Sequence, residues 1–400
     1  EKDQIVASLK NIGISQSKPY SRNLIDKVKQ ELVRLYFDNG RYSSSVEVTE
    51  NELENNIIEL SLNINEGKAS TIKEIKILGN KTYSTRLLKS LIKSGPKYWF
   101  EVWSDKDIYN STLLDQDIEA IRDYYLNRGY AKFEIISKQV NLSPNKEDIY
   151  ITLSIKEGNL YKFGKITIYG LDKFDPNIFN NIIDNNIKPG TSFSRSNIEG
   201  SKKAIEFILG EKGYAFPTIL VNVALQDNKG LVDIDFRVDP KKKSFVRRIN
   251  IKGNTKTNDE VYRRELRQFE SSTYSESKIQ RSKIRLQRLK FVNQVDVNKT
   301  IIDENNGYID IDFLLDETQS GEFKIGAGYS DSNGAIFNVK VQQDNFLGKG
   351  NNVALELEKS SYKTLLRYRN TNPYFTEDEI SKSTYIVLSE TDVSETSTAA

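Results

Sequence analysis

The stretch Asn127–Ile135 reads NRGYAKFEI, and the stretch Glu211–Ile219 reads EKGYAFPTI. Each follows a segment with helical spacing and leads into a segment with strand-like alternation. Before the first stretch, one helix face collects the apolar residues Leu114, Ile118, Ile121 and Tyr125. Gly129 and Gly213 stand where a glycine commonly ends a helix. Because the same landmark is written twice in one chain, we expect a fold built from repeats.

The repeated unit occurs four times. Glycine ends the helix in three copies, at Gly40, Gly129 and Gly213, and a weaker fourth copy has Lys290 at that position. An aromatic residue and an N-cap residue open the helix in every copy, namely Tyr20-Ser21, Tyr109-Asn110, Phe193-Ser194 and Tyr274-Ser275. One strand-like run precedes the helices and two follow them. The predicted unit is an α+β domain in the order strand, helix, helix, strand, strand, with two helices on one face of a three-stranded sheet.

The repeats predict the domain limits. They span 1–68, 69–158, 159–241 and 242–318, and residues 319–400 form a separate part. The first copy lacks its opening strand, because the chain starts almost directly before a short helical pattern at 5–9. The chain also contains no Met. We therefore expect a processed chain or a fragment that begins within a domain.

After residue 318 the sequence alternates like a sheet with one apolar face. In Gly321–Ser330, Phe323 and Ile325 lie on one side, and Gly326 and Gly328 lie on the other. Such strands are typical of a transmembrane β-barrel, although a soluble antiparallel sheet with one buried face fits the alternation equally well. About five strands cannot close a membrane barrel, which needs about eight or more. We expect the remainder of a barrel to lie beyond Ala400.

Composition argues against an enzyme. The chain has no Cys and no His, so thiolate chemistry and the commonest general base are absent. No phosphate-binding glycine loop, EF-hand spacing or nucleophile elbow occurs. The 58 basic and 56 acidic residues leave a formal net charge of +2, which gives no overall attraction to nucleic acid. We expect no cofactor, no metal and no nucleic-acid partner.

Four motifs carry a resemblance to a known family. They are IRDYYLNRGYA at Ile121–Ala131, VYRRELRQF at Val261–Phe269, QQDNFLGKG at Gln342–Gly350 and NPYF at Asn372–Phe375. Together with the four units and the barrel-like strands, they resemble the POTRA repeats and β-barrel of the BamA family of outer-membrane protein assembly factors. The resemblance implies that the last two motifs end early barrel strands. It singles out as structural motif residues Gly129, Gly213, Asp344, Asn345, Gly348, Asn372, Pro373, Tyr374 and Phe375.

The same resemblance implies a function. The chain would fold and insert β-barrel proteins into the outer membrane of a diderm bacterium without covalent catalysis. Its repeats, similar to the second to fifth of the family, would lie in the periplasm and bind unfolded clients, a BamD-like lipoprotein and other Bam lipoproteins. The barrel would contact outer-membrane lipid. The alternatives are another POTRA transporter, of the TamA or two-partner secretion type, and a non-membrane adhesin or scaffold; four copies favour BamA over the two transporters.

The fourth repeat is the predicted partner-binding surface. Residues 241–300 hold 17 basic and 6 acidic side chains. Arg263, Arg264 and Arg267 are expected on the first helix of this repeat, and Lys278 on the second. The resemblance places a BamD-like partner at the RRELRQFE stretch, which adds Glu270. Anionic lipid headgroups are a second expected contact, and a solvated charged helix face is the alternative.

Two segments are predicted to pair with an unfolded client strand. The first is 130–140 at a sheet edge, where the chosen residues are Tyr130, Lys132, Phe133 and Ile135. A protected edge that binds nothing is the alternative. The second is the first barrel strand, where the chosen residues are Phe323, Ile325, Gly326 and Gly328. Its glycines could weaken a seam that opens for a client, or they could only relieve crowding inside the barrel.

Overall fold

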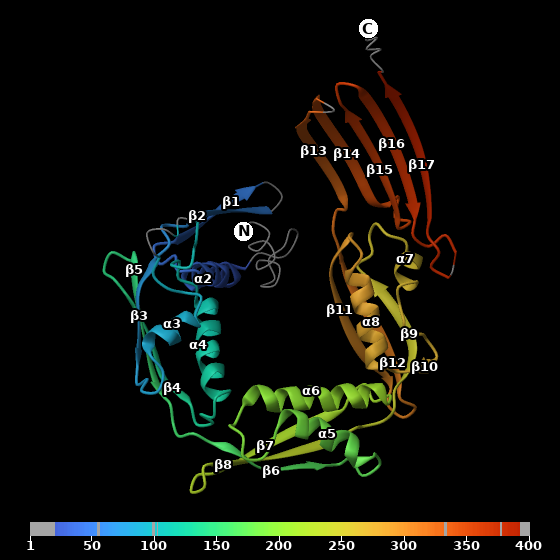
Figure 1. The fold of residues 1–400 in the computed structure, drawn as a ribbon. Coiled ribbons are helices and arrows are strands. Elements are labelled where there is room, and N and C mark those ends of the chain that lie inside the picture. The colour runs from blue at the N-terminus through green and yellow to red at the C-terminus, as the bar shows by residue number, and fades with distance from the viewer. Residues whose placement is uncertain are drawn as a thin grey trace, which may run out of the picture. The chain divides into compact units, whose positions relative to one another are not determined.

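Figure 1 shows the computed structural model, which describes residues 21–53, 57–97, 101, 103–331, 334–376 and 378–392. The helix expected at 5–9 lies outside the described residues. The chain divides into two compact units. One comprises Glu1–Thr167, Asn180–Ser201 and Val221–Asp235, and the other comprises Ile168–Phe179, Lys202–Leu220 and Phe236–Ala400. The five domain limits expected from the sequence stay a prediction.

The second repeat has the predicted order of elements. These are β3 (Thr71–Leu78), α3 (Thr85–Ser90), α4 (Ser111–Leu126), β4 (Glu134–Leu142) and β5 (Asp148–Lys156). The strand β5 lies in the middle of the sheet, parallel to β3 and antiparallel to β4. Both helices lie against this sheet, and Leu88 of α3 and Ile121 of α4 are fully buried in the shared core (Figure 1).

Alternation along β5 explains why this strand is central. Its apolar residues Ile149, Ile151, Leu153 and Ile155 are all at most 3% exposed. Side chains two positions apart point to the same face of a strand, so all four reach the helices. The alternation in the sequence predicts this core correctly.

The first and third repeats follow the same plan. The first comprises α2 (Arg22–Asp38) and the antiparallel pair β1 (Ser45–Leu53) and β2 (Ile57–Asn65). The third comprises β6 (Lys162–Tyr169), α5 (Pro176–Asn186), α6 (Arg195–Glu211), β7 (Thr218–Gln226) and β8 (Leu231–Asp239). Its strands lie in the order β6-β8-β7, which matches the order in the second repeat.

The fourth repeat departs from the prediction in two ways. Its elements are β9 (Phe245–Lys252), α7 (Asp259–Arg263), β10 (Ser272–Thr273), α8 (Glu276–Gln287), β11 (Val292–Asp303) and β12 (Tyr308–Glu317). The short strand β10 makes the sheet four-stranded, in the order β10-β9-β12-β11. The helix α7 is only five residues long, because the N–H groups of Glu265 and Leu266 bond to carbonyls three residues back and tighten the last turn.

Helix starts confirm the predicted caps at Asn110, Ser194 and Ser275, whereas Ser21 stands at the N-cap of α2 without a side-chain cap bond. The side chain of Asn110 accepts the N–H of Leu113 at the start of α4, and the side chain of Ser275 accepts the N–H of Lys278 at the start of α8. Gly129 and Gly213 have φ values of +98° and +99°, a left-handed conformation that glycine adopts without steric cost. The landmark in the sequence is therefore a helix stop.

The same glycine also joins one repeat to the next. The carbonyl of Gly129 accepts the N–H of Tyr161 at 2.8 Å, and the carbonyl of Tyr161 accepts the N–H of Phe193 at 3.0 Å. Equivalent pairs of bonds, at 2.8 and 3.2 Å and at 2.8 and 3.0 Å, run through Gly40, Ser70 and Tyr109 and through Gly213, Ser244 and Tyr274. We call this three-residue chain of bonds the junction relay. The relay explains why the helix-ending glycine recurs in the sequence. Each of these glycines ends a helix, and its carbonyl bonds the start of the following repeat.

A second contact accompanies each relay. A side chain at the end of one helix bonds the start of the equivalent helix in the following repeat. Asn39 Oδ1 accepts from Asn110 Nδ2 at 2.8 Å, and Asn127 Oδ1 accepts the N–H of Ser196 at 2.8 Å. Glu211 Oε1 accepts the N–H of Ser277 at 2.5 Å. The bonds to Ser196 and Ser277 satisfy backbone donors that a helix start leaves free, and the bond to Asn110 contacts the side chain that caps α4.

The last part of the chain is a single antiparallel sheet. Its strands pair in sequence order and are β13 (Gly321–Ser330), β14 (Gly334–Phe346), β15 (Asn351–Lys359), β16 (Lys363–Asn372) and β17 (Lys382–Thr391). The fold is thus tandem α+β repeats followed by antiparallel strands, as predicted. Among the described residues, none of the helices has both the length and the apolar character needed to span a membrane.

Candidate functional site

The strand predicted at 130–140 for client pairing begins later than expected. The strand β4 starts at Glu134, so Tyr130, Lys132 and Phe133 precede it and only Ile135 lies on it. The chain turns before the strand, where the N–H of Phe133 bonds the carbonyl of Tyr130 at 3.0 Å. Tyr130 and Phe133 are 5% and 7% exposed, and Phe133 stacks on Tyr125 with ring centroids 4.4 Å apart. Core packing overrides the strand pattern in this segment.

Lys132 of the second repeat bonds to the third repeat. Its Nζ lies 2.6 Å from Asp227 Oδ2, in the turn between β7 and β8, and Tyr161 donates to Asp227 Oδ1 at 2.8 Å. The hydrogen bond with Asp227 raises the pKa of Lys132, and the bonds from Lys132 and Tyr161 lower the pKa of Asp227. The predicted client contact of this lysine is thus occupied within the chain.

The strand β4 itself lies at a sheet edge, as predicted. The pairing with β5 is interrupted between Ile135 and Ser137, which leaves Ile136 in a bulge and 62% exposed. Further along, Lys138 pairs with Asp115 at 2.6 Å. Bulges and charged side chains are common ways of protecting an edge strand, so the open part of this edge is short.

The strand β13 lies at the edge of the last sheet. Phe323 and Ile325 are 64% and 70% exposed on one face. Gly326 and Gly328 occupy the other face, and they pair with Asn338 and Ile336 of β14. A Cβ at Gly328 would meet no described atom within 4 Å, and one at Gly326 would only reach Asn338 Cβ at 4.0 Å. Crowding among the described residues therefore does not explain these glycines.

The predicted partner-binding residues of the fourth repeat divide into two groups. Arg263 lies on α7, where it pairs with Asp259 and lies 3.7 Å from Glu270 Oε1. Glu270 accepts the N–H of Ile249 at 2.7 Å, which ties it to β9. Lys278 is exposed in the first turn of α8 and makes no side-chain ion pair with any described residue. These three side chains remain on the surface of the repeat.

Arg264 points instead toward the last sheet. Its guanidinium lies over the ring of Tyr374, with Cζ 4.2 Å from the ring centroid. On its other side it approaches Gly350 so closely that a Cβ there would lie 2.3 Å from Nη2. Burial lowers the pKa of Arg264, and its Nε has no hydrogen-bond partner. The ring face of Tyr374 compensates this half-buried charge.

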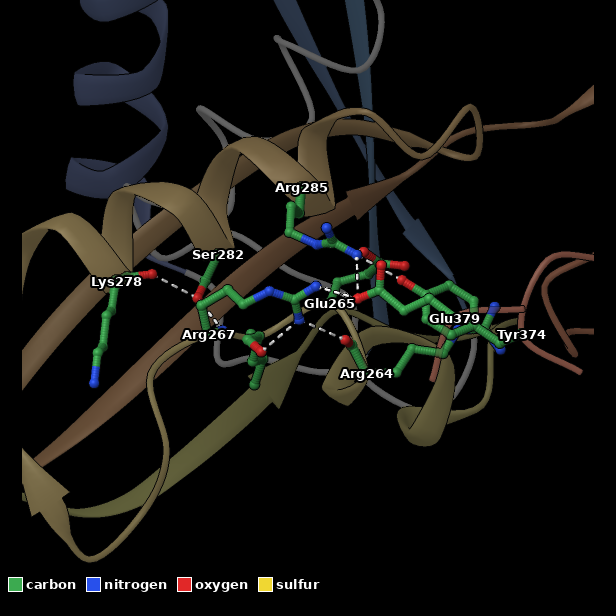
Figure 2. Close-up of polar contacts among 9 residues, drawn as sticks. Arg264, Glu265, Arg267, Lys278, Ser282, Arg285, Tyr374 and Glu379 are labelled. Atoms are coloured by element: carbon green, nitrogen blue, oxygen red, sulfur yellow. Dashed lines mark hydrogen bonds and ion pairs between the residues drawn. The ribbon is translucent and has the colours of Figure 1, made fainter. Parts of the chain in front are cut away.

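Arg267 and Arg285 converge on the same turn of the last sheet (Figure 2). Both guanidinium groups contact Glu379 Oε1, Arg285 at 3.2 Å and Arg267 through a short ion pair. Arg285 also donates to Glu265 Oε2 at 2.9 Å and to the hydroxyl of Tyr374 at 2.7 Å. We call this set the arginine cluster: Arg264, Arg267, Arg285, Glu265, Tyr374 and Glu379.

The motif QQDNFLGKG forms a second contact with the fourth repeat. Asn345 Nδ2 donates to Thr257 Oγ1 at 2.7 Å, and the N–H of Asn258 donates to the carbonyl of Gly348 at 3.0 Å. A Cβ at Gly348, where φ is +73°, would lie 2.3 Å from the carbonyl oxygen of Lys256. Asp344 Oδ2 lies 3.4 Å from Lys290 Nζ. Lys290 stands in the fourth repeat where the other three repeats have a helix-ending glycine. It contacts the antiparallel sheet that follows, just as each of those glycines contacts the repeat that follows it.

The loop beneath this contact is held by the partly buried carboxylate of Glu317. Glu317 accepts from the N–H groups of Thr255, Lys256 and Thr257 and from the hydroxyl of Tyr262, at 2.7 to 3.1 Å. Burial alone would raise the pKa of Glu317, but these hydrogen bonds prevail and lower it to about 2. The loop that receives Asn345 and Gly348 is therefore held by contacts within the fourth repeat itself.

The motif NPYF shapes the turn that carries Tyr374. Asn372 Oδ1 accepts the N–H of Tyr374 at 3.0 Å, which is an Asx-turn, and Pro373 restricts the backbone between them. Phe375 is 55% exposed, and Lys382 Nζ lies 4.4 Å from its ring centroid. The motif thus shapes a turn that presents Tyr374 to the fourth repeat.

Sequence reasoning missed three members of the arginine cluster as site residues: Glu265, Arg285 and Glu379. Their partners are 20 to 112 residues away in the chain, and no motif spacing links them. Among the described residues, no group of three or more carboxylates is placed to hold a metal ion. The site is built for docking by charge, aromatic contact and hydrogen bonds.

Comparison with known proteins agrees with this architecture. The POTRA family model, described as surface antigen variable number repeat, matches residues 7–67, 70–158, 161–241 and 244–318. The outer membrane protein assembly factor BamA of Neisseria meningitidis serogroup B is 29% identical over 385 residues, covering 95% of this chain. The alignment covers 48% of that relative, so this chain spans about half its length.

Solved structures also resemble the chain, and two of them are similar to it at more than 25% identity with TM-scores above 0.5. A structure of BamA POTRA3-5 from Haemophilus influenzae has 27% identity and a TM-score of 0.56, covering 62% of this chain and 97% of that one. BamA from Haemophilus ducreyi lacking POTRA domains 1-3 has 28% identity and a TM-score of 0.52, covering 59% of this chain and 44% of that one. The four segments that match the family model make up well over half of the 400 residues. The chain therefore belongs to the POTRA family, and BamA proteins are among the relatives to which it is similar.

Proposed function

We propose that the protein folds and inserts β-barrel proteins into the bacterial outer membrane, as a central component of a Bam complex. One observation carries the proposal: POTRA repeats and an antiparallel barrel-type sheet occur in one chain that is similar to BamA over 95% of its length. The protein lies in the outer membrane with its repeats in the periplasm. Its work is non-covalent, because strand pairing and membrane insertion need no bond to be made or broken.

The repeats and the first strand of the last sheet would receive clients by different routes. A client strand adds to β4 at residues 137–142, beyond the bulge, where the sheet edge is open. A client also pairs with β13, whose glycines weaken the strand and are not required by crowding among the described residues. The exposed apolar face of β13, with Phe323 and Ile325, suits contact with lipid.

Lipoprotein partners would dock on the outer face of the fourth repeat. Arg263, Glu270 and Lys278 support this role because they stay on the surface while Arg264 and Arg267 contact the last sheet. A BamD-like partner is the proposed occupant of this face. A charge reversal at Arg267 would not test this face alone, since it would also break the ion pair with Glu379 in the arginine cluster.

Reconstitution tests the proposed function. The purified protein is placed in liposomes, a urea-unfolded outer-membrane β-barrel protein is added, and its folded fraction is followed by resistance to unfolding in SDS. We expect folding several-fold faster than in protein-free liposomes, because an edge strand lowers the barrier to the first pairing. Equal rates with and without the protein, also after its lipoprotein partners are added, would refute the proposal.

A further inference from the structure

The arginine cluster contains two guanidinium groups that meet at one carboxylate oxygen. Arg267 and Arg285 both contact Oε1 of Glu379 (Figure 2). Two guanidinium groups on one oxygen form a strong receptor for a carboxylate, because hydrogen bonds between charged groups are stronger than those between neutral groups. The receptor and its occupant come from different parts of the chain: the fourth repeat and the turn between β16 and β17.

The receptor is positioned without help from Glu379. Arg267 Nη1 donates to the carbonyls of Arg264 and Leu266, each at 3.1 Å, and the backbone N–H of Arg267 donates to Ser282 Oγ at 2.8 Å. Arg285 Nε is bound to Glu265, a residue that is 5% exposed. Both guanidinium groups therefore keep their positions if the carboxylate leaves.

Glu379 is held far less firmly. Its side chain is 46% exposed, and its backbone has a φ of +63°, a left-handed conformation that is unfavourable for a residue with a Cβ. Among its described residues, the turn is closed by the backbone bond from the N–H of Phe375 to the carbonyl of Ile380 at 2.9 Å. The carboxylate is therefore the replaceable half of the contact.

The surroundings favour an acidic visitor. Lys278 and Arg281 are exposed on α8 and the exposed Arg288 directly follows it, and within the described ranges none of the three forms an ion pair with a carboxylate. Arg281 interacts electrostatically with Glu211, but a protein partner that docks along α8 with acidic side chains would still gain from this excess of positive charge. A basic partner would be repelled by it.

We propose that Arg267 and Arg285 form a carboxylate-binding site that Glu379 occupies within the chain and that an acidic side chain of a protein partner occupies in its place. Docking of the partner then releases Glu379 from the fourth repeat. Because one oxygen position serves both carboxylates, the two states exclude each other. The proposal rests on the proposed function for the existence of a partner on this repeat, and it adds the regulation of that contact.

Peptide binding tests the exchange. The protein in detergent micelles is titrated against a fluorescent synthetic hexaglutamate peptide, and anisotropy gives the Kd. Glu379→Gln removes the competing charge and should tighten binding at least threefold. The matched control is Asp378→Asn, which removes the same charge from the same turn at an exposed residue that has no ion pair among the described residues. The change in Kd caused by Asp378→Asn should be less than half as large as the change caused by Glu379→Gln.

A second pair of variants locates the binding site. Arg267→Gln, combined with Glu379→Gln, should abolish the gain in affinity. Arg248→Gln, at an exposed arginine of β9, should preserve it. Equal gains from Glu379→Gln and Asp378→Asn, no gain at all, or a gain that survives Arg267→Gln would each overturn the proposal. The assay contains no client and no insertion step, so its failure leaves the reconstitution result standing, and failure of reconstitution leaves the peptide result standing.

Discussion

At Gly129 the backbone takes a left-handed conformation at the point where the second repeat meets the third. A Cβ at this residue would lie 2.9 Å from Leu160 Cδ2 and 3.2 Å from the carbonyl oxygen of Tyr161. Tyr161 is also the residue whose N–H bonds the carbonyl of Gly129. Conformation and close approach thus require glycine for separate reasons, and both reasons belong to the junction relay.

Substituting this glycine should loosen the junction. Gly129→Ala should cost at least about 1 kcal/mol, because an L-residue pays about 1–2 kcal/mol in the left-handed region before any overlap is counted. Hydrogen exchange measures the effect: the amides of Tyr161 and Phe193 should exchange about fivefold faster, the factor that about 1 kcal/mol gives.

The matched control is Gly200→Ala. Gly200 lies within α6, its φ is not in the left-handed region, and a Cβ there would meet nothing within 4 Å. Alanine in a helix interior is favoured over glycine by about 0.5–1 kcal/mol, so exchange at the junction should stay unchanged or slow slightly. If both variants behave alike at Tyr161, the relay does not hold the junction.

Among the elements, the edge strand β4 and the central strand β5 offer a direct comparison. Both carry an exposed apolar or aromatic side chain, Ile136 at 62% and Tyr150 at 43%. Only β4 has a free edge. If clients bind by strand addition, backbone availability should matter and side-chain exposure should not.

Photo-crosslinking separates these two possibilities. A benzoylphenylalanine at position 136 should crosslink to an unfolded outer-membrane β-barrel protein, and the same group at position 150 should crosslink several-fold less. Similar yields at the two positions would mean that clients adhere to exposed apolar side chains, and β4 would then be a protected edge that binds no strand.

The elements also show how far the sequence reaches. Alternation at Ile149, Ile151, Leu153 and Ile155 predicts β5, and Asn110 and Ser275 predict helix starts, because these signals are local in the chain. The strand pattern at Tyr130 and Phe133 fails because both rings pack on Tyr125, which is a tertiary effect.

The site was less predictable than the fold. The motif NPYF and the basic fourth repeat stand out in the sequence, yet nothing local pairs Tyr374 with Arg264, which is 110 residues earlier. The contact between Tyr374 and Arg264 depends on how the last sheet docks on the fourth repeat. Docking leaves no periodic pattern in the sequence from which this contact could be predicted. The resemblance to the family identified the motif residues, and the structure shows which residues of the fourth repeat Tyr374 and Asn345 contact.

On the scale of the fourth repeat and the sheet that follows it, three contacts act together. The linker of residues 318–320 is bonded from Thr318 N–H to the carbonyl of Phe291 at 3.1 Å. The turn with Asn345 and Gly348 docks on the loop held by Glu317. The arginine cluster holds the turn with Tyr374. A short linker alone would leave freedom to hinge, and the two docked turns remove it.

Removing the aromatic contact should expose the linker. Tyr374→Ala deletes the ring over Arg264, a contact worth about 0.5–2 kcal/mol when partly desolvated, and leaves the half-buried guanidinium without it. Proteinase K should then cut within residues 318–320 several-fold faster than in the unaltered protein. Tyr362→Ala is the control, since this tyrosine is 49% exposed in the loop between β15 and β16, at the other end of the strands. Equal cleavage in the two variants would show that the turn with Asn345 and Gly348 holds the sheet by itself, and the arginine cluster would then add no stability to the docked state.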